Sequence, residues 1–335
     1  MIVCNPIIMI LKAILNWFRL RRDYIANAVN KIPPEIKDAL VAWYSPCKQK
    51  LTNYDVIESY AEDFTNWAYR NTRGTAKITN NTIVITNVVE TNNIVEDDNK
   101  PYSDLTIRVT GVTENKYLIV RQGRGKPETH IKKDGVYTFK DNNLYFGFGI
   151  SVIGECNITI TQLPTSILKD FSGNKHDAYL YGFKGKLNSG VGIYTNDFTD
   201  SGVTNSTWRY EKGIVTVNGH NSFTIIKATY DWIFRCTKNV SAMKIQIVGM
   251  NNEVDFRYRY ESSNGDKWIY LNQDGVYELP ATIGTWQGFW IKNPNNVNVN
   301  IIVTQIPDYP NQLCYDGKSY AVAYGLPILT DYTII

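Results

Sequence analysis

The sequence predicts a mainly β protein, in which an N-terminal α-helix precedes two tandem, duplicated antiparallel β-sandwiches of the jelly-roll type. Three observations support this prediction. Short runs of β-branched and aromatic residues, which suit a half-buried pleated surface, alternate with Asn, Gly and Asp, which suit turns. One set of these runs occurs twice along the 335 residues. The helical spacing that the crossovers of a parallel sheet require is missing from both copies.

The first element is a helix over residues 7–32, where apolar side chains recur with a 4-3 spacing that only Arg22 interrupts. Pro33 and Pro34 end this helix. A narrow apolar seam of this kind is typical of a coiled coil. Residues 1–34 are therefore predicted to join chains into a homodimer or homotrimer, or to dock the chain onto a larger particle. The seam consists of Ile8, Leu11, Leu15, Phe18, Ile25, Val29 and Ile32.

Two alternatives for this helix stay open. In the first, it packs against its own sandwich. In the second, it is a secretory signal or a membrane anchor. Lys12 and Asn16 interrupt the apolar stretch, which is shorter than the about 20 residues that a membrane span needs, and the Arg cluster follows the stretch instead of preceding it. Assembly or docking is therefore preferred, and no membrane partner is predicted.

Residues 35–59 are predicted to form a helical connector between this helix and the first sandwich, because no matching segment precedes the second copy. Thr52 or Asn53 would cap a helix whose apolar side chains share one face. This face consists of Ile57, Tyr60, Phe64 and Trp67.

The two sandwiches are predicted to cover residues 60–186 and 194–335, because several strands recur with a nearly constant offset. "NITITQLP" starts at 157 and "NIIVTQIP" at 300, and "DGVYTF" starts at 134 and "DGVYEL" at 274. "GNKHDAYLYGF" at 173–183 returns as "DGKSYAVAYGL" at 316–326. Trp67 and Trp208 lie at corresponding places near the start of each copy. The copies should therefore superpose strand for strand.

The residue types that carry catalysis or bind metals are scattered along the chain. His130, His176 and His220 stand in polar, turn-like segments without a neighbouring nucleophile, and the five cysteines have no C-x-x-C spacing. We therefore predict no catalytic residues, no metal, no cofactor, and free thiols in a reducing cytoplasm. A net charge of +3 without a concentrated basic face predicts no nucleic-acid partner. A pair of carboxylates brought together by folding, as in a glycosidase, stays open.

Four tryptophans are candidates for stacking on the faces of sugars: Trp232, Trp268, Trp286 and Trp290. Exposed tryptophans would act in this way, whereas buried ones would be core residues. Weak binding at a single site becomes useful when tandem sandwiches display several sites at once.

Two segments resemble known proteins. "WYSPCKQKLTNYD" at 43–55 and "LKDFSGNKHDAYLYGFKGKLNSGVGIY" at 168–194 resemble segments of virion proteins from crAss-like tailed phages that infect Bacteroides. The "DFSGNKHDAYLYGF" part is also similar to the D-x-SGNG-x-D-G motif of laminin-G-like, concanavalin-type jelly rolls. Lys50 and Lys175 stand where these families usually carry a glycine, a residue that marks a positive φ or a close backbone approach.

The resemblance implies a β-sandwich carried on a phage particle. On this basis we expect a non-enzymatic virion structural protein, a head fibre or capsid decoration subunit, located in the virion after synthesis in the bacterial host cytoplasm. Its expected partners are copies of itself and capsid or other virion proteins. Two alternatives remain: a carbohydrate- or receptor-binding module that contacts host-surface or mucin glycans, and a polysaccharide-degrading enzyme.

Overall fold

The computed structural model describes residues 41–67, 75–86, 92–96, 104–121, 127–140, 147–152, 157–201, 206–210, 214–227, 230–262, 265–283, 287–295 and 297–327. Within these residues the prediction of a mainly β, antiparallel fold is confirmed, since 52% of them are in strands and 3% in helices. The predicted N-terminal helix and its entire seam lie outside the described residues.

The described chain divides into two units. The N-unit comprises residues 41–50, 54–183 and 317–327, and the C-unit comprises residues 51–53 and 184–316, with the gaps given above. Each unit contains one β-sandwich, which we name the N-sandwich and the C-sandwich. Residues 317–327 thus belong to the N-unit, although the sequence predicts them to end the second copy.

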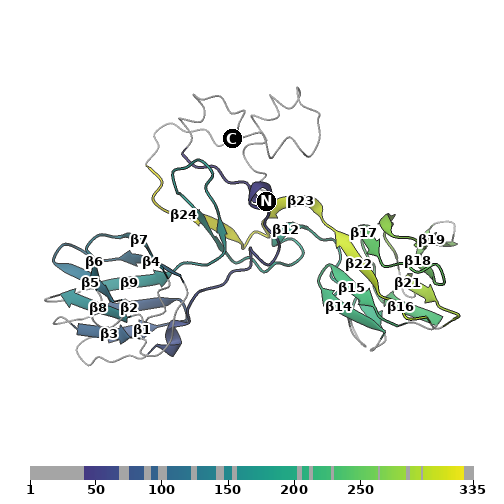
Figure 1. The fold of residues 1–335 in the computed structure, drawn as a ribbon, viewed down its shortest axis with the longest axis horizontal. Helices are drawn as coiled ribbons and strands as arrows, with labels where there is room; N and C mark the ends of the chain where they lie inside the picture. The colour runs from purple at the N-terminus through teal and green to yellow at the C-terminus, as the bar shows by residue number, and fades with distance from the viewer. Residues whose placement is uncertain are drawn as a thin grey trace, which may run out of the picture. The chain divides into compact units, whose positions relative to one another are not determined.

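The N-sandwich consists of two antiparallel sheets (Figure 1). Both contribute fully buried side chains to one core, for example Ile83 and Ile160 from the first sheet and Leu118 and Val120 from the second. In spatial order, the first sheet contains β1 (Thr75–Ile78), β2 (Thr82–Thr86), β9 (Asn157–Gln162), β4 (Leu105–Thr110) and β7 (Gly135–Phe139). The second contains β3 (Asn92–Glu96), β8 (Gly147–Val152), β5 (Lys116–Arg121) and β6 (Glu128–Ile131).

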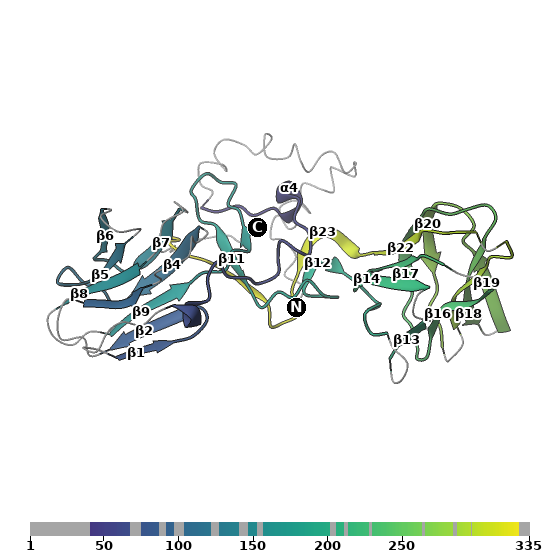
Figure 2. The same ribbon diagram turned by 60° about the horizontal axis from the view of Figure 1, so that its bottom comes forward.

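The C-sandwich repeats this arrangement strand for strand, with two sheets that form separate layers (Figure 2). Its first sheet contains, in the same spatial order, β14 (Val215–Gly219), β15 (Ser222–Ile225), β22 (Ile301–Ile306), β17 (Met243–Val248) and β20 (Gly275–Leu279). Its second sheet contains β16 (Tyr230–Cys236), β21 (Gln287–Lys292), β18 (Asp255–Ser262) and β19 (Gly265–Tyr270), with β13 (Trp208–Tyr210) added beside β16. The repeated strands "NITITQLP" and "NIIVTQIP" form β9 and β22, the central strands of equivalent sheets.

The ends of the two copies form small sheets of their own. In the N-unit, β10 (Ile167–Leu168), β11 (Ala178–Tyr181) and β24 (Tyr320–Ala323) make a three-stranded sheet. In the C-unit, β12 (Gly190–Ile193) pairs with β23 (Asp308–Cys314). β11 and β24 are the same strand of the sequence repeat, and they pair antiparallel with Tyr179 opposite its own counterpart, Val322. One repeated strand therefore pairs with its copy about a local two-fold axis.

The prediction of a helix capped by Thr52 or Asn53 is wrong. Within the described residues 41–67, a short helix precedes this point, α4 (Pro46–Gln49), and a 3-10 turn follows it, η2 (Phe64–Asn66). The Asn53 side chain does not cap a helix, because its Oδ1 accepts a hydrogen bond from Val191 N at 2.6 Å within the C-unit.

Tertiary hydrogen bonds replace the helical ones in this segment. The N–H of Glu58 donates to Phe183 O at 3.1 Å, and the carbonyl of Ser59 accepts from Thr165 N at 2.8 Å. The predicted apolar face is therefore divided. Its last two members are buried in the N-sandwich core, whereas Ile57 is exposed.

Lys50 and Lys175 adopt the left-handed backbone conformation, with φ of 57° and 64°. These are the two positions where the resembling families usually carry glycine. Lys50 ends α4, and its N–H donates to Cys47 O at 3.1 Å. The turn geometry is therefore retained without the glycine, at the conformational cost that a side chain incurs there.

Candidate functional site

One outer face of the C-sandwich gathers aromatic and charged side chains. It lies on β18, β19 and β21, whose inward residues Phe256, Tyr258 and Phe289 fill the core. Because successive residues of a strand alternate between its two faces, the residues beside these three point outward. On β19, Tyr270 and Trp268 lie directly opposite Arg257 and Arg259 and share their face. We name this outward set the aromatic face, which consists of Arg257, Arg259, Trp268, Tyr270 and Trp290.

The rings of the aromatic face surround one guanidinium group. The Cζ atom of Arg257 lies 4.5 Å from the ring centroid of Tyr270, 5.1 Å from that of Trp290 and 5.9 Å from that of Trp268. The two indole rings meet edge-on, with centroids 5.8 Å apart. Such cation–π contacts hold the rings in place. Trp268 remains 37% exposed and Tyr270 57% exposed, so a ligand can reach both from solvent.

Each arginine of the aromatic face is paired with an aspartate. Arg257 donates through Nε to Asp255 Oδ1 at 2.9 Å and pairs with the same carboxylate through Nη2. Arg259 pairs through Nη2 with Asp266, whose Oδ1 also accepts a hydrogen bond from Gln287 Nε2 at 3.3 Å. The opposite charges cancel, and the pairs hold hydrogen-bond donors and acceptors side by side.

The N-sandwich has no aromatic face at the equivalent positions. The equivalence follows from the repeated "DGVY" segment after β6 and β19 and from the pairing of the strands. The places of Arg257, Trp268, Tyr270 and Trp290 are taken by Ile119, Glu128, His130 and Gly149, in that order. Because both sandwiches fold with the same strands, the fold does not require these aromatic side chains.

Of the four tryptophans predicted to stack on a ligand, the structure brings Trp268 and Trp290 together on one face. The backbone of Trp232 pairs with that of Trp290, and Trp286 lies outside the described residues. Their role as ligand contacts stays a prediction.

The sequence-based prediction omits three members of the aromatic face: Arg257, Arg259 and Tyr270. The arginines carry a signal in the strict alternation of "DFRYRY", which places the aromatic residues on one side of a strand and the charges on the other. Tyr270 carries no such signal, because its position opposite Arg257 depends on the register of two strands.

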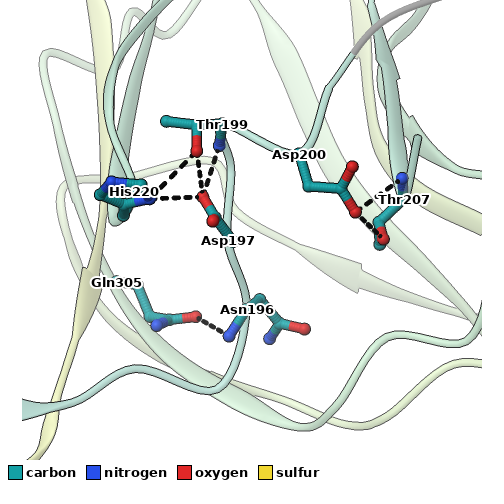
Figure 3. A network of polar contacts seen from close by, with 7 residues as sticks. All are labelled: Asn196, Asp197, Thr199, Asp200, Thr207, His220 and Gln305. Atoms are coloured by element: carbon teal, nitrogen blue, oxygen red, sulfur yellow. Dashed lines mark hydrogen bonds and ion pairs between the residues drawn. The ribbon is translucent and has the colours of Figure 1, made fainter. Parts of the chain in front are cut away.

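A second polar cluster lies near the start of the C-sandwich (Figure 3). Asp197 Oδ1 accepts hydrogen bonds from Thr199 N at 2.8 Å and from Thr199 Oγ1 at 2.5 Å, and it lies 2.8 Å from Nδ1 of His220. Partial burial raises the pKa of Asp197, but the bonds from Thr199 and His220 lower it more, so the pKa lies below its ordinary value. The cluster thus contains the residue types of a hydrolase triad: an acid, an imidazole and a hydroxyl.

The geometry of this cluster does not form a proton relay. A triad uses both ring nitrogens of its histidine, one facing the acid and the other facing the hydroxyl. Here the oxygens of Asp197 and Thr199 both face Nδ1 of His220, at 2.8 and 3.0 Å. This contact pattern supports a structural role and not nucleophilic catalysis.

The same turn recurs in the N-sandwich without a histidine. Asp63 Oδ1 accepts hydrogen bonds from Thr65 N at 3.0 Å and from Thr65 Oγ1 at 2.6 Å. The phenylalanine between the two polar residues is buried in both copies, as Phe64 and as Phe198. The Asp-Phe-Thr turn is therefore a repeated part of the fold.

Replacing His220 with asparagine, which stands at the equivalent place as Asn80, should leave the C-sandwich folded. The pair with Asp197 is partly exposed, so its loss should change the free energy of unfolding by less than about 1 kcal/mol. Thermal unfolding of the variant measures this change. A drop of several kcal/mol would show that the histidine itself holds the turn.

A third cluster joins, within the N-unit, the two segments that carry the phage resemblance. The Asp170 carboxylate accepts hydrogen bonds from the N–H groups of Trp43 at 2.9 Å, Ser172 at 2.8 Å and His176 at 3.0 Å, and from Ser172 Oγ at 2.8 Å. Partial burial raises the pKa of Asp170, but these hydrogen bonds lower it more, so the pKa lies below its ordinary value. The carboxylate therefore acts as the centre of a turn.

The described residues contain no group of three or more His, Cys, Asp or Glu side chains placed to share a metal ion. Among the described residues, Cys47, Cys236 and Cys314 are not joined to one another by disulfide bonds. In the part of the chain that the structure describes, no helix is long and apolar enough to cross a membrane.

No family model matches the chain, and no curated protein matches it. Among solved structures, the vicilin of hazelnut, Corylus avellana, is 10% identical, with 77% of this chain and 85% of that chain covered and a TM-score of 0.20. An oxalate decarboxylase from Lactobacillus farciminis is 8% identical, with 80% and 89% covered and a TM-score of 0.17. The CBM22-1–CBM22-2 tandem domain of Xyn10C from Paenibacillus barcinonensis is 12% identical, with 76% and 97% covered and a TM-score of 0.22. TM-scores this low carry no information about the function of this chain.

Proposed function

We propose that this chain is a non-enzymatic structural protein of a phage virion, a head fibre or capsid decoration subunit that displays two copies of one β-sandwich. The observation that supports this function is the contact between the two segments that resemble phage virion proteins. Trp43 and Asp170 lie 127 residues apart in the sequence and are joined by a hydrogen bond. Two chance matches would have no reason to meet, whereas two parts of one folded element would.

The composition of purified phage particles tests this proposal. Mass spectrometry of particles banded on a density gradient should detect this chain in several copies per particle, and an antibody raised against the C-sandwich should label them. A host cytoplasmic protein serves as the control for carry-over. Finding the chain in the infected lysate and not in the particles would contradict the proposal.

Assembly through the predicted N-terminal seam is part of this proposal. Leu15→Asp combined with Ile25→Asp should convert an oligomer into monomers, because each buried apolar side chain contributes about 1.5 to 3 kcal/mol. Asn16→Asp combined with Asn27→Asp adds the same charge away from the seam and serves as the control. Light scattering measures the mass in solution. An unchanged mass for the seam variant would show that other residues hold the chains together.

A second candidate function is a carbohydrate- or receptor-binding module, which the aromatic face favours. Exposed Trp268 and Tyr270 lie on one surface together with paired charges, and ligand sites commonly combine aromatic surface with a few fixed polar groups. The two functions are compatible, since a virion protein that displays sandwiches also displays this surface.

A further inference from the structure

We infer that the aromatic face binds a neutral saccharide, with a pyranose ring laid against Trp268 and Tyr270. This inference rests on the second candidate function and adds to it the class of ligand.

The rings are presented on an edge strand. β19 is the last strand of its sheet, and large apolar side chains exposed on an edge strand invite aggregation unless a function keeps them there. Trp268 and Tyr270 are both exposed. The C–H groups on one face of a pyranose are apolar, so a sugar covers such rings without burying its hydroxyls.

The rings are also fixed before any ligand arrives. Arg257 lies within 6 Å of all three ring centroids of the aromatic face, and its contact with Asp255 fixes the guanidinium in turn. A side chain that is already ordered loses little conformational entropy on binding. Such a surface suits a ligand with few hydrophobic atoms, for which the ordering cost would otherwise exceed the gain.

The balance of charge favours a neutral ligand over an acidic one. The outward positions of β18, β19 and β21 carry three basic and three acidic side chains: Arg257, Arg259 and Lys292, and Asp255, Glu261 and Asp266. Both arginines are engaged with carboxylates. To contact either arginine, an acidic sugar would have to displace one of these carboxylates, whereas a sugar hydroxyl accepts from the guanidinium and donates to the carboxylate without separating them.

The N-sandwich supplies an internal comparison. It has the same strands, but Glu128 and His130 take the places of Trp268 and Tyr270. His130 stacks on Tyr117, with ring centroids 5.1 Å apart, and lies 3.4 Å from a Glu128 oxygen. The rings and charges of the N-sandwich therefore contact one another differently, and this sandwich should not bind the ligand.

Calorimetric titration of the full chain tests the inference. The neutral probes are N-acetyllactosamine, maltohexaose and xylohexaose, and the acidic probes are sialylated and sulfated N-acetyllactosamine. We expect at least one neutral probe to bind and the acidic probes to bind at least tenfold more weakly than that one. Trp268→Ala and Tyr270→Ala should each weaken the binding at least tenfold, while Tyr270→Phe should retain most of it.

His130→Ala, at the equivalent position of the N-sandwich, is the matched control and should bind as the unchanged protein does. Thermal unfolding checks that the variants fold, as expected for side chains on an outer face. Preferred binding of an acidic probe, unchanged affinity in both alanine variants, or no binding of any neutral probe at millimolar concentration would overturn the inference. The presence of the chain in virions is measured by a separate experiment. The virion proposal can therefore stand when saccharide binding fails, and saccharide binding can stand when the virion proposal fails.

Discussion

Gly249→Ala is expected to destabilise the C-sandwich strongly while the stability of the N-sandwich stays unchanged, and Gly111→Ala is expected to do the reverse. The two glycines occupy the same place in the repeat, just after β17 and β4, with φ of +89° and +88°. A Cβ atom would lie 2.3 Å from Asn300 O in one copy and 1.9 Å from Asn157 O in the other. A left-handed conformation and a backbone clash together should cost about 3 kcal/mol or more.

Differential scanning calorimetry of the full chain measures this effect, because the two sandwiches have separate hydrophobic cores. Gly173→Ala and Gly265→Ala are the matched controls for the N-unit and the C-unit. Both have positive φ, but a Cβ atom would meet nothing within 4 Å, so each should lose only about 1 to 2 kcal/mol. If Gly249→Ala lowered the stability no more than Gly265→Ala, this result would contradict the close approach of Gly249 to the backbone of Asn300.

Asp170→Ala should release the segment around Trp43 from the turn at 170–176. Three backbone N–H groups lose their charged acceptor. The loss of these hydrogen bonds should lower the free energy of unfolding of the N-unit by about 2 to 3 kcal/mol. Hydrogen exchange of the Trp43 and His176 amides reports the release directly. Asp104→Ala, which removes an exposed ion pair with Lys140, is the control and should leave these amides protected.

The Asp170 carboxylate should also make the stability of the N-unit depend on pH. The pKa of Asp170 is lowered in the folded chain from an ordinary value of 3.8, so the unfolded chain binds the proton more readily. The stabilisation is therefore complete above the ordinary pKa and is lost as the pH falls below it, through the folded value. The wild-type protein should lose protection of the His176 amide on acidification below about pH 4, whereas the alanine variant should already lack that protection at neutral pH.

The repeat made most of the fold predictable from the sequence. The strands around "NITITQLP" and "NIIVTQIP" are confirmed, because β-branched alternation and the turn residues act locally. The helix expected after Asn53 did not form, because hydrogen bonds to Val191 and Phe183, which are distant in the sequence, replaced the local ones. Tertiary contacts of that kind cannot be predicted from the helix propensities of the local residues.

The candidate site was predictable only in part. Trp268 and Trp290 stand out as residue types, but their meeting around Arg257 depends on the register of β18 with β19 and with β21. A shift of one residue would turn the same side chains to the opposite face. The lack of an aromatic face on the N-sandwich could not be predicted either, because the equivalent positions are assigned from the pairing of the strands.

Nuclear magnetic resonance tests whether the aromatic face of the C-sandwich binds a neutral saccharide. The most direct measurement is a titration of the nitrogen-15-labelled full chain with the neutral probe that binds, followed through the indole N–H resonances of its tryptophans. The resonances of Trp268 and Trp290 should shift with the probe, while those of the buried Trp67 and Trp208 should stay in place. Saturating shifts confined to other tryptophans, with Trp268 and Trp290 unmoved, would contradict binding at the aromatic face.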